Sequence, residues 1–302
     1  MDFHTLDVFT LAPYSGNPLA VVLGADDLTT AQMQTVAREF NLSETIFVQT
    51  PDDAAHSAKV RIFFPTAEIP FAGHPTIGCA ILLAEQQNSG DFSVEITLEE
   101  VAGLVPVQVV RKDGVTRAEF TAPVNPFAVE GSDLDVDNVA AGLGLEVPDI
   151  GFGAHVCGHW QGGPSFLYVP VSTSAALSKA APNGAAWERL TAAADCNSAY
   201  LYTPDGSGGF TSRMFAPGVG IPEDPATGSA SAIFAAQLLA AGELFEGENK
   251  FALEQGVDMG RPSQIGLSVD VSGGAIIAVR IAGTAVQISS GTLGALPLPI
   301  QN

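Results

Sequence analysis

The sequence predicts an α+β fold of two similar halves, each a barrel-like, mostly antiparallel sheet wrapped around a central helix. Three observations predict this fold. Each half has many short stretches with strand-like alternation, each contains one long apolar helix entered through a glycine, and both helices are apolar on every side. A helix without a polar face must be covered all round, which a strongly curved sheet can do. The match between the halves indicates an internal repeat.

In the first half, strands alternate with two helices. Residues 28–42 have helical spacing, with Thr29 or Thr30 as the N-cap. The first apolar helix is expected at 75–87. The strands are expected at 2–10, 19–24, 43–50 and 58–66, and as several strands joined by turns within 92–123.

The second half begins after "FTAPVNPF", where Pro123 and Pro126 suggest a boundary. The predicted domains are therefore 1–122 and 123–302, and the last strand can pair back with the first domain. Helices are expected at 134–144 and 185–196, followed by the second apolar helix, which opens in "ATGSASAIFAAQLLA". The strands are expected at 164–172, 198–204 and 209–217, and as a run of strands within 266–296.

The composition excludes several classes of protein. The 302 residues carry a net charge of −21, which argues against binding to nucleic acid or to an anionic membrane. No stretch reaches the roughly 18 apolar residues of a membrane helix, and the first residues lack the features of an export signal. Three cysteines without CxxC spacing are expected as free thiols in a reducing cytoplasm.

The two apolar helices carry similar residues at their first turns. The N–H groups of a first turn have no partner within the helix and carry partial positive charge, so they can hold an anion. Gly73 and Gly228 let a ligand approach the backbone closely, and His74 and Ser229 add a donor at each position. If the halves face each other, the two helix ends form one cleft for a carboxylate and a developing enolate-like charge. The alternative is that Gly228 and Ser229 only cap their helix.

Other polar residues have open interpretations. Either Glu223 or Asp224 can bind a substrate amine or hydroxyl, or share a proton with His74. Alternatively, Asp224 simply starts the turn before Pro225. Arg213 and Arg261 are candidates to offset negative charge near the cleft. For Arg261, the preferred interpretation is a structural hydrogen bond to the chain. The pattern "HVCGH" at 155–159 invites a metal site but has no further ligands nearby, so no metal is expected.

Five ordered motifs resemble the phenazine-biosynthesis isomerase (PhzF-like) family, which is related in fold to diaminopimelate epimerase and proline racemase. They are "GNPLAVV", "AREFNLSETIFV", "RIFFPTAEIPFAGHPTIG", "MFAPGVGIPEDPATGSA" and "QGVDMGRPS". The resemblance implies two barrel-and-helix halves with an active site in the cleft between them, a homodimer, and neither a metal nor an organic cofactor.

The resemblance also implies roles for individual residues. Glu44 matches the acid that shuttles the proton, although alone it is only an acid before a strand, open to a surface or capping role. The polar residues around the substrate are matched by His74, Asp224 and Ser229. The site-lining backbone positions are matched by Gly73 and Gly228, and Asn17 matches a further lining position. Apolar walls from Phe47 and Phe71 could raise the pKa of Glu44.

The related racemases carry a cysteine at each helix start, where this chain has His74 and Ser229. A two-thiol mechanism is therefore excluded, and one carboxylate must carry the proton. The sequence thus predicts a cofactor-independent isomerase that moves a proton between carbons of a small carboxylate. The alternatives are a racemase or epimerase, and a non-catalytic small-molecule binding protein.

Overall fold

A computed structural model of the chain describes residues 1–131 and 134–294. Its contacts divide the chain into two compact units, Ala122–Ile281 and Met1–Thr121 together with the chain from Ala282 onward. Strand β17 (Ala275–Thr292) continues through this division, and its second part pairs with β1 (Asp2–Val8) in the first unit. The last two residues of the predicted strand run 266–296 lie outside the described residues. Within the described chain, every helix is too short or too polar to cross a membrane.

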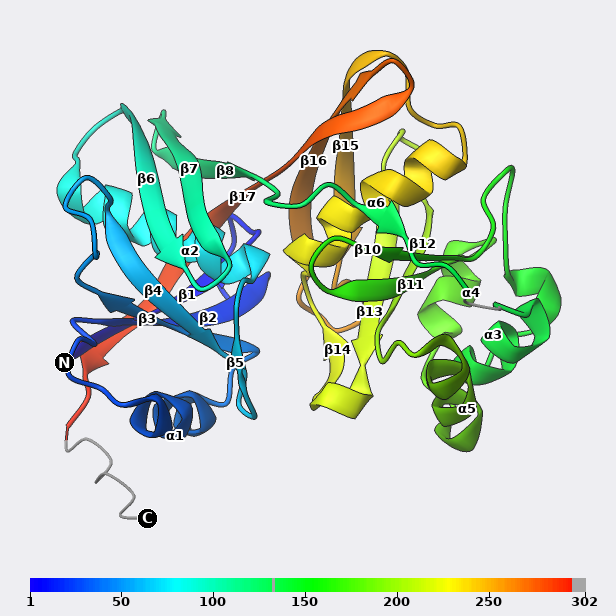
Figure 1. Ribbon diagram of the computed structural model, residues 1–302, viewed down its shortest axis with the longest axis horizontal. Coiled ribbons are helices and arrows are strands. Elements are labelled where there is room, and N and C mark those ends of the chain that lie inside the picture. The colour runs from blue at the N-terminus through cyan, green and yellow to red at the C-terminus, as the bar shows by residue number, and fades with distance from the viewer. Residues whose placement is uncertain (132–133, 295–302) are drawn as a thin grey trace. The chain divides into compact units, whose positions relative to one another are not determined.

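The first unit is a closed barrel of eight strands (Figure 1). The neighbours pair in the order β1–β2–β3–β4–β6–β7–β8, and β17 pairs with both β8 and β1 to close the ring. Two of these pairings, β2–β3 and β4–β6, are parallel. The pairings β1–β2, β1–β17, β3–β4, β6–β7 and β7–β8 are antiparallel. The further bounds are β2 Asn17–Leu23, β3 Glu44–Gln49, β4 Ala58–Phe63, β5 Glu68–Ile69, β6 Phe92–Glu100, β7 Gly103–Lys112 and β8 Val115–Thr121.

Helix α2 (Gly73–Gln87) forms the centre of this barrel. It contacts β1, β2, β3, β6, β7 and β8, and every residue from Gly73 to Ala84 is buried. This burial explains why the helix sequence has no polar face over that stretch. The predicted central helix of the first half is therefore confirmed, with its start at Gly73 rather than at residue 75.

The second unit repeats this plan. Strands pair in the order β9–β10–β11–β12–β13–β15–β16, and α6 (Gly228–Ala240) contacts β9, β10, β11 and β16. The aromatic rings of Tyr202 and Phe210 lie 4.5 and 5.1 Å from the ring of Phe234 in α6. The strand bounds are β9 Phe127–Ala128, β10 Gly158–Gln161, β11 Ser165–Pro170, β12 Ala199–Pro204, β13 Phe210–Ala216, β14 Ile221–Asp224, β15 Gly247–Gln255 and β16 Ser263–Ser272.

The internal repeat is visible in the strand pairings. In the first unit, β4 pairs with the short strand β5, the chain passes through α2, and β6 returns parallel to β4. In the second unit, β13 pairs with the short strand β14, the chain passes through α6, and β15 returns parallel to β13. Each central helix is therefore the crossover between two parallel strands. The predicted fold class is confirmed in both units.

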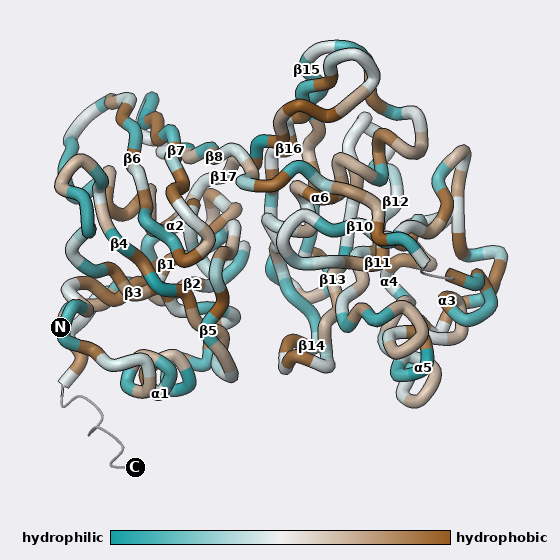
Figure 2. Tube along the Cα trace, in the orientation of Figure 1, coloured by the Kyte–Doolittle hydropathy of each residue, from teal (hydrophilic) through white to brown (hydrophobic). Residues whose placement is uncertain are grey.

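The remaining helices pack on the outside of the sheets. In the first unit, α1 (Thr30–Phe40) has Thr29 as its N-cap and buries Met33, Val36 and Ala37 on one face, and Figure 2 shows hydrophilic and hydrophobic residues alternating along it. In the second unit, a separate apolar cluster joins the helices to β11 and β12. Its helices are α3 Val136–Leu143, α4 Ser174–Lys179 and α5 Gly184–Ala194.

Candidate active site

The N-terminus of α2 has no side-chain cap. Its N-cap residue is Ala72, in an extended conformation with φ −152°, and the first helical residue is Gly73. Pro75 lies within the first turn, where a proline removes no helical hydrogen bond. The first-turn N–H groups of Gly73 and His74 therefore lie at a helix end whose capping residue provides no side-chain acceptor.

Three predicted site residues meet at this end of α2. Glu44 is the first residue of β3, Asn17 is the first residue of β2, and His74 is the second residue of α2. The Glu44 Oε2 atom lies 3.4 Å from His74 Nε2, and Asn17 Nδ2 lies 3.3 Å from His74 Nδ1. All three side chains are buried. The parallel pairing of β2 with β3, which sets Leu19 beside Glu44, brings the two strand starts together.

His74 is a neutral imidazole at ordinary pH. Burial lowers its pKa from 6.5 to about 3, although a hydrogen bond to the Pro18 carbonyl opposes this shift. The ring therefore has both a carbonyl acceptor and the Asn17 amide among its partners. A neutral ring beside Glu44 can share a hydrogen bond with the carboxyl group, and the direction of that bond depends on the tautomer.

The prediction that Phe47 forms an apolar wall beside Glu44 is wrong. Successive side chains of a strand point to opposite faces, so Phe47 lies on the face opposite Glu44. Its ring packs edge-to-face on Phe63 at 5.4 Å, within the apolar cluster beneath α1. Phe71 packs its ring against Phe120, at 5.6 Å between centroids.

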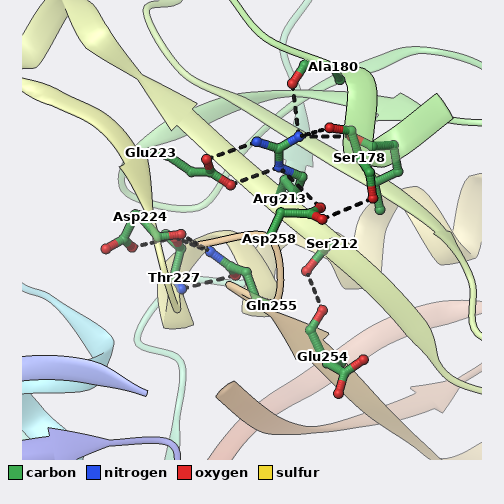
Figure 3. Close-up of polar contacts among 11 residues, drawn as sticks. Ser178, Ala180, Ser212, Arg213, Glu223, Asp224, Thr227, Glu254, Gln255 and Asp258 are labelled. Carbon is green, nitrogen blue, oxygen red and sulfur yellow. Dashed lines mark hydrogen bonds and ion pairs between the residues drawn. The ribbon is translucent and has the colours of Figure 1, made fainter. Parts of the chain in front are cut away.

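The second unit has a different arrangement at the start of α6. The N-cap is Thr227, whose hydroxyl donates to Asp224 Oδ2 at 2.5 Å instead of capping the helix. Gln255 on β15 accepts from Thr227 N at 3.1 Å and donates to the Asp224 carbonyl at 2.7 Å (Figure 3). The turn between β14 and α6 is therefore tied to β15, and Asp224 is held in a buried position.

Gly228 and Ser229 occupy the first two positions of α6. Gly228 is buried and Ser229 is half-buried. The capping alternative for Ser229 is wrong, because the N-cap position belongs to Thr227. The turn alternative for Asp224 agrees with the contact to Thr227, and its substrate and proton-sharing roles stay predictions.

Arg213 is an anchor within the second unit. Its Nε and Nη2 atoms donate to the two carboxylate oxygens of Glu223 at 2.8 and 2.9 Å. Its Nη1 atom donates to three carbonyls around the end of α4 (Figure 3), those of Leu177, Ser178 and Ala180. The guanidinium group on β13 is thus paired with Glu223 on β14, the residue before Asp224.

The three cysteines and His155 lie outside this region. Cys79 and Cys196 are buried free thiols and Cys157 is a half-buried one. His155 uses both ring nitrogens, Nδ1 with the Tyr202 hydroxyl at 2.9 Å and Nε2 with Glu243 at 3.2 Å. His155 is therefore part of a polar network with β12 and the residues after α6.

Sequence reasoning missed Thr227 and Gln255. Thr227 was visible in "ATGS" as a helix-start residue, and its contact with Asp224 follows from the three-residue spacing. Gln255 had no such signal, because it lies in a strand that the sequence did not reveal. The prediction that the two helix starts form one cleft stays a prediction.

Comparisons with known proteins identify the family of this chain. The model of the phenazine biosynthesis-like protein family, PhzC-PhzF, matches residues 6–291. An uncharacterized isomerase of Mesorhizobium japonicum is 41% identical over 293 residues, which cover 95% of this chain and 96% of the relative. A trans-2,3-dihydro-3-hydroxyanthranilate isomerase of Pseudomonas chlororaphis is 33% identical over 291 residues, covering 95% and 97%.

The fold has a close counterpart among solved structures. A PhzF-family phenazine biosynthesis protein of Bacillus anthracis superposes with a TM-score of 0.85 at 26% identity, covering 98% of this chain and 99% of that one. The repeated barrel-and-helix fold and these relatives define an isomerase. The chain belongs to the PhzC-PhzF phenazine biosynthesis-like family, as its five motifs indicated.

Proposed function

We propose that the protein is a cofactor-independent isomerase that moves a proton between carbons of a small carboxylate substrate. Glu44 is the proton carrier, His74 holds it in place, and Asn17 contacts the other nitrogen of the His74 ring. The observation that carries this proposal is the buried contact of 3.4 Å between Glu44 Oε2 and His74 Nε2 at the start of α2. It places a single acid beside a neutral ring and a helix N-terminus.

The chemistry follows from these groups. Removing a proton from carbon leaves negative charge, which a substrate carboxylate can delocalise as an enolate. The first-turn amides of α2 offer partial positive charge to such an anion without a metal. Glu44 takes the proton as a base and returns it to another carbon as an acid, so no net proton is consumed.

The neutral state of His74 suits this cycle. A positively charged imidazolium would hold Glu44 ionised by charge attraction and oppose the protonated half of the cycle. A neutral ring 3.4 Å from Glu44 favours neither form of the carboxyl group by charge. His74 therefore orients the carboxyl group and does not compete with it for the proton.

The substrate class is inferred from the relatives and from Asp224. The relative from Pseudomonas chlororaphis is named for trans-2,3-dihydro-3-hydroxyanthranilate, whose name specifies a carboxylate, an amine and a hydroxyl group. We infer a substrate with the same kinds of group. The Asp224 carboxylate would accept from the amine or hydroxyl, and the helix starts at Gly73 and Gly228 would receive the carboxylate.

The experiment is deuterium incorporation. The purified protein is incubated in D2O with trans-2,3-dihydro-3-hydroxyanthranilate and with a panel of other small carboxylates, with and without a chelator. The proposal expects carbon-bound deuterium in at least one compound, unaffected by chelation. Strict dependence on an added metal or organic cofactor would contradict it.

A second experiment tests whether both units serve one substrate. With any compound that exchanges deuterium, Asp224→Asn and His74→Asn are measured singly and together. If both residues act on one bound substrate, each variant lowers kcat/KM for that compound and the two effects are not additive. Unchanged kcat/KM in Asp224→Asn would remove Asp224 from the site.

A further inference from the structure

A carboxyl group outside the proposed chemistry is buried in the first barrel. Glu100 ends β6 and is 7% exposed, and alternation along β6 puts it on the same inward face as Ile96 and Leu98. The inward residues of the adjacent strand β7 are Val105, Val107 and Val109. An acid at such a position costs free energy unless it is neutral or well bonded, so it needs an explanation.

The contacts of Thr76 bear on the protonation state of Glu100. Thr76 Oγ1 lies 2.7 Å from the carbonyl oxygen of Ala72 and 2.6 Å from Glu100 Oε1. A hydroxyl group has one hydrogen to donate, and the Ala72 carbonyl can only accept. If Thr76 donates to Ala72, then Glu100 must donate to Thr76, and only a carboxylic acid can do so. An ionised Glu100 would leave one of the two short contacts as a pair of oxygens with no hydrogen between them.

The surroundings of Glu100 also favour the acid form. Burial raises its pKa from 4.5 to about 8, although donation from Thr76 to the ionised form would act in the opposite direction. On α2, burial and then the charge of Glu100 raise the pKa of the Cys79 thiol, so this group is also held in its neutral form. Elsewhere on α2, His74 is neutral and Glu85 accepts from Thr116 at 2.5 Å. On β6 itself, Glu99 lies on the other face, 2.7 Å from His56.

We propose that Glu100 is a positioning residue, held as a neutral carboxylic acid, that fixes the start of α2 through Thr76 and Ala72. Ala72 is the N-cap, so the next two residues of the chain are Gly73 and His74. The chain of hydrogen bonds thus supplies the side-chain support that α2 lacks at its N-cap. The inference rests on the proposed function only in treating the start of α2 as part of the active site.

Ionisation of Glu100 would reverse the direction of this chain. Thr76 would turn its hydrogen from Ala72 to the carboxylate, and a negative charge would be buried within the barrel. Since the folded pKa lies above the ordinary value of 4.5, the folded protein keeps a proton that the unfolded chain releases. Stability from this group is therefore full at acidic pH and is lost as pH rises toward about 8.

Infrared spectroscopy tests the protonation state. A protonated carboxyl group absorbs apart from carboxylates, so the wild-type protein at neutral pH should show a band that Glu100→Gln lacks and that disappears on alkaline titration. Glu99→Gln on the same strand is the matched control and should retain the band. If Glu100→Gln removes intensity only from the carboxylate region, Glu100 is ionised and the proposal is wrong.

Nuclear magnetic resonance of the His74 ring tests the positioning role without any substrate. Thr76→Val keeps the shape of the side chain but breaks the hydrogen-bond chain, and should shift the His74 ring signals. Thr76→Ser keeps the hydroxyl group and should leave them near the wild-type values. Glu100→Gln retains a neutral donor and should also preserve them.

Unchanged His74 signals in a folded Thr76→Val protein would contradict positioning. Both measurements are independent of turnover, so they can fail while the proposed isomerase activity holds, and they can succeed while it fails. If a Glu100 variant does not fold, the Thr76 pair still tests the proposal.

Discussion

His74 is the residue at which burial has the largest consequence for the site. Its ring lies fully within the barrel between Asn17 and Glu44, and burial keeps it neutral. The motif "GHPT" predicted a polar residue at the helix start, but the sequence could not predict the charge state. That state depends on the enclosure by six strands, which arises only when the barrel closes.

Stability should therefore fall as the solution becomes acidic. The unfolded chain binds a proton at His74 below about pH 6.5, whereas the folded pKa is about 3. The folded state binds fewer protons in this window, so the contribution of His74 to stability is present above pH 6.5 and is lost as pH falls toward 3. Urea unfolding of His74→Asn should show a smaller loss between neutral and acidic pH than the wild type. His4→Asn is the control, and an equal loss in wild type and His74→Asn would contradict this assignment.

At the scale of elements, the two central helices are defined by close packing as well as by hydrophobicity. Gly78 of α2 faces β1 and β2, where an added Cβ would lie 2.6 Å from Leu19 Cδ2 and 2.8 Å from Val8 Cγ2. Alanine is a better helix former than glycine by about 1 kcal/mol, but it does not fit here. The glycine allows the helix to approach the strands.

Gly78→Ala should therefore destabilise the protein, by about 1–3 kcal/mol in the free energy of unfolding. Ala31→Gly, at an exposed position of α1, isolates helix propensity and should cost only about 1 kcal/mol. Denaturant unfolding measures both variants. A stabilising effect of Gly78→Ala would show that α2 is not packed closely against β1 and β2.

Arg213 links three elements of the second unit, namely β13, β14 and the end of α4. Replacing it with alanine leaves the half-buried Glu223 and three carbonyls without their donor. We expect a loss of about 3 kcal/mol in the free energy of unfolding. The more exposed pair of Lys59 and Asp52, 2.8 Å apart, provides the control, and Lys59→Ala should cost no more than about 1 kcal/mol. Equal losses of unfolding free energy in the two variants would show that Arg213 contributes no more than a surface ion pair does.

At the scale of the whole molecule, the repeated fold was predictable because apolarity all round a helix demands an enclosing sheet. The elements that the sequence missed have weak periodicity. Strand β15 turns Asn249 and Gln255 inward beside Leu253, so its pattern lacks the apolar alternation of a typical strand. Strands β10 and β14 have four residues each, and β14 contains Pro222.

The candidate site was predictable in part from sequence motifs. Glu44, His74 and Asn17 occur in family motifs and meet in the first unit. Glu100 on β6 contacts the start of α2, and Gln255 on β15 contacts the start of α6. Contacts between residues so far apart in the sequence leave no local signal in it. The homodimer, the cytoplasmic location and the shared cleft stay predictions. Light scattering in solution tests the first of these.

The central claim is that one carboxyl group carries the proton. The most direct test is deuterium exchange by Glu44→Gln on a carboxylate that the wild-type protein turns over, with binding of the same compound measured in parallel. Gln keeps the shape and hydrogen bonding of Glu but cannot carry a proton, so binding should persist while exchange falls by about a thousandfold to ten-thousandfold. Near-normal exchange by Glu44→Gln would contradict the account and transfer the role of base to another residue.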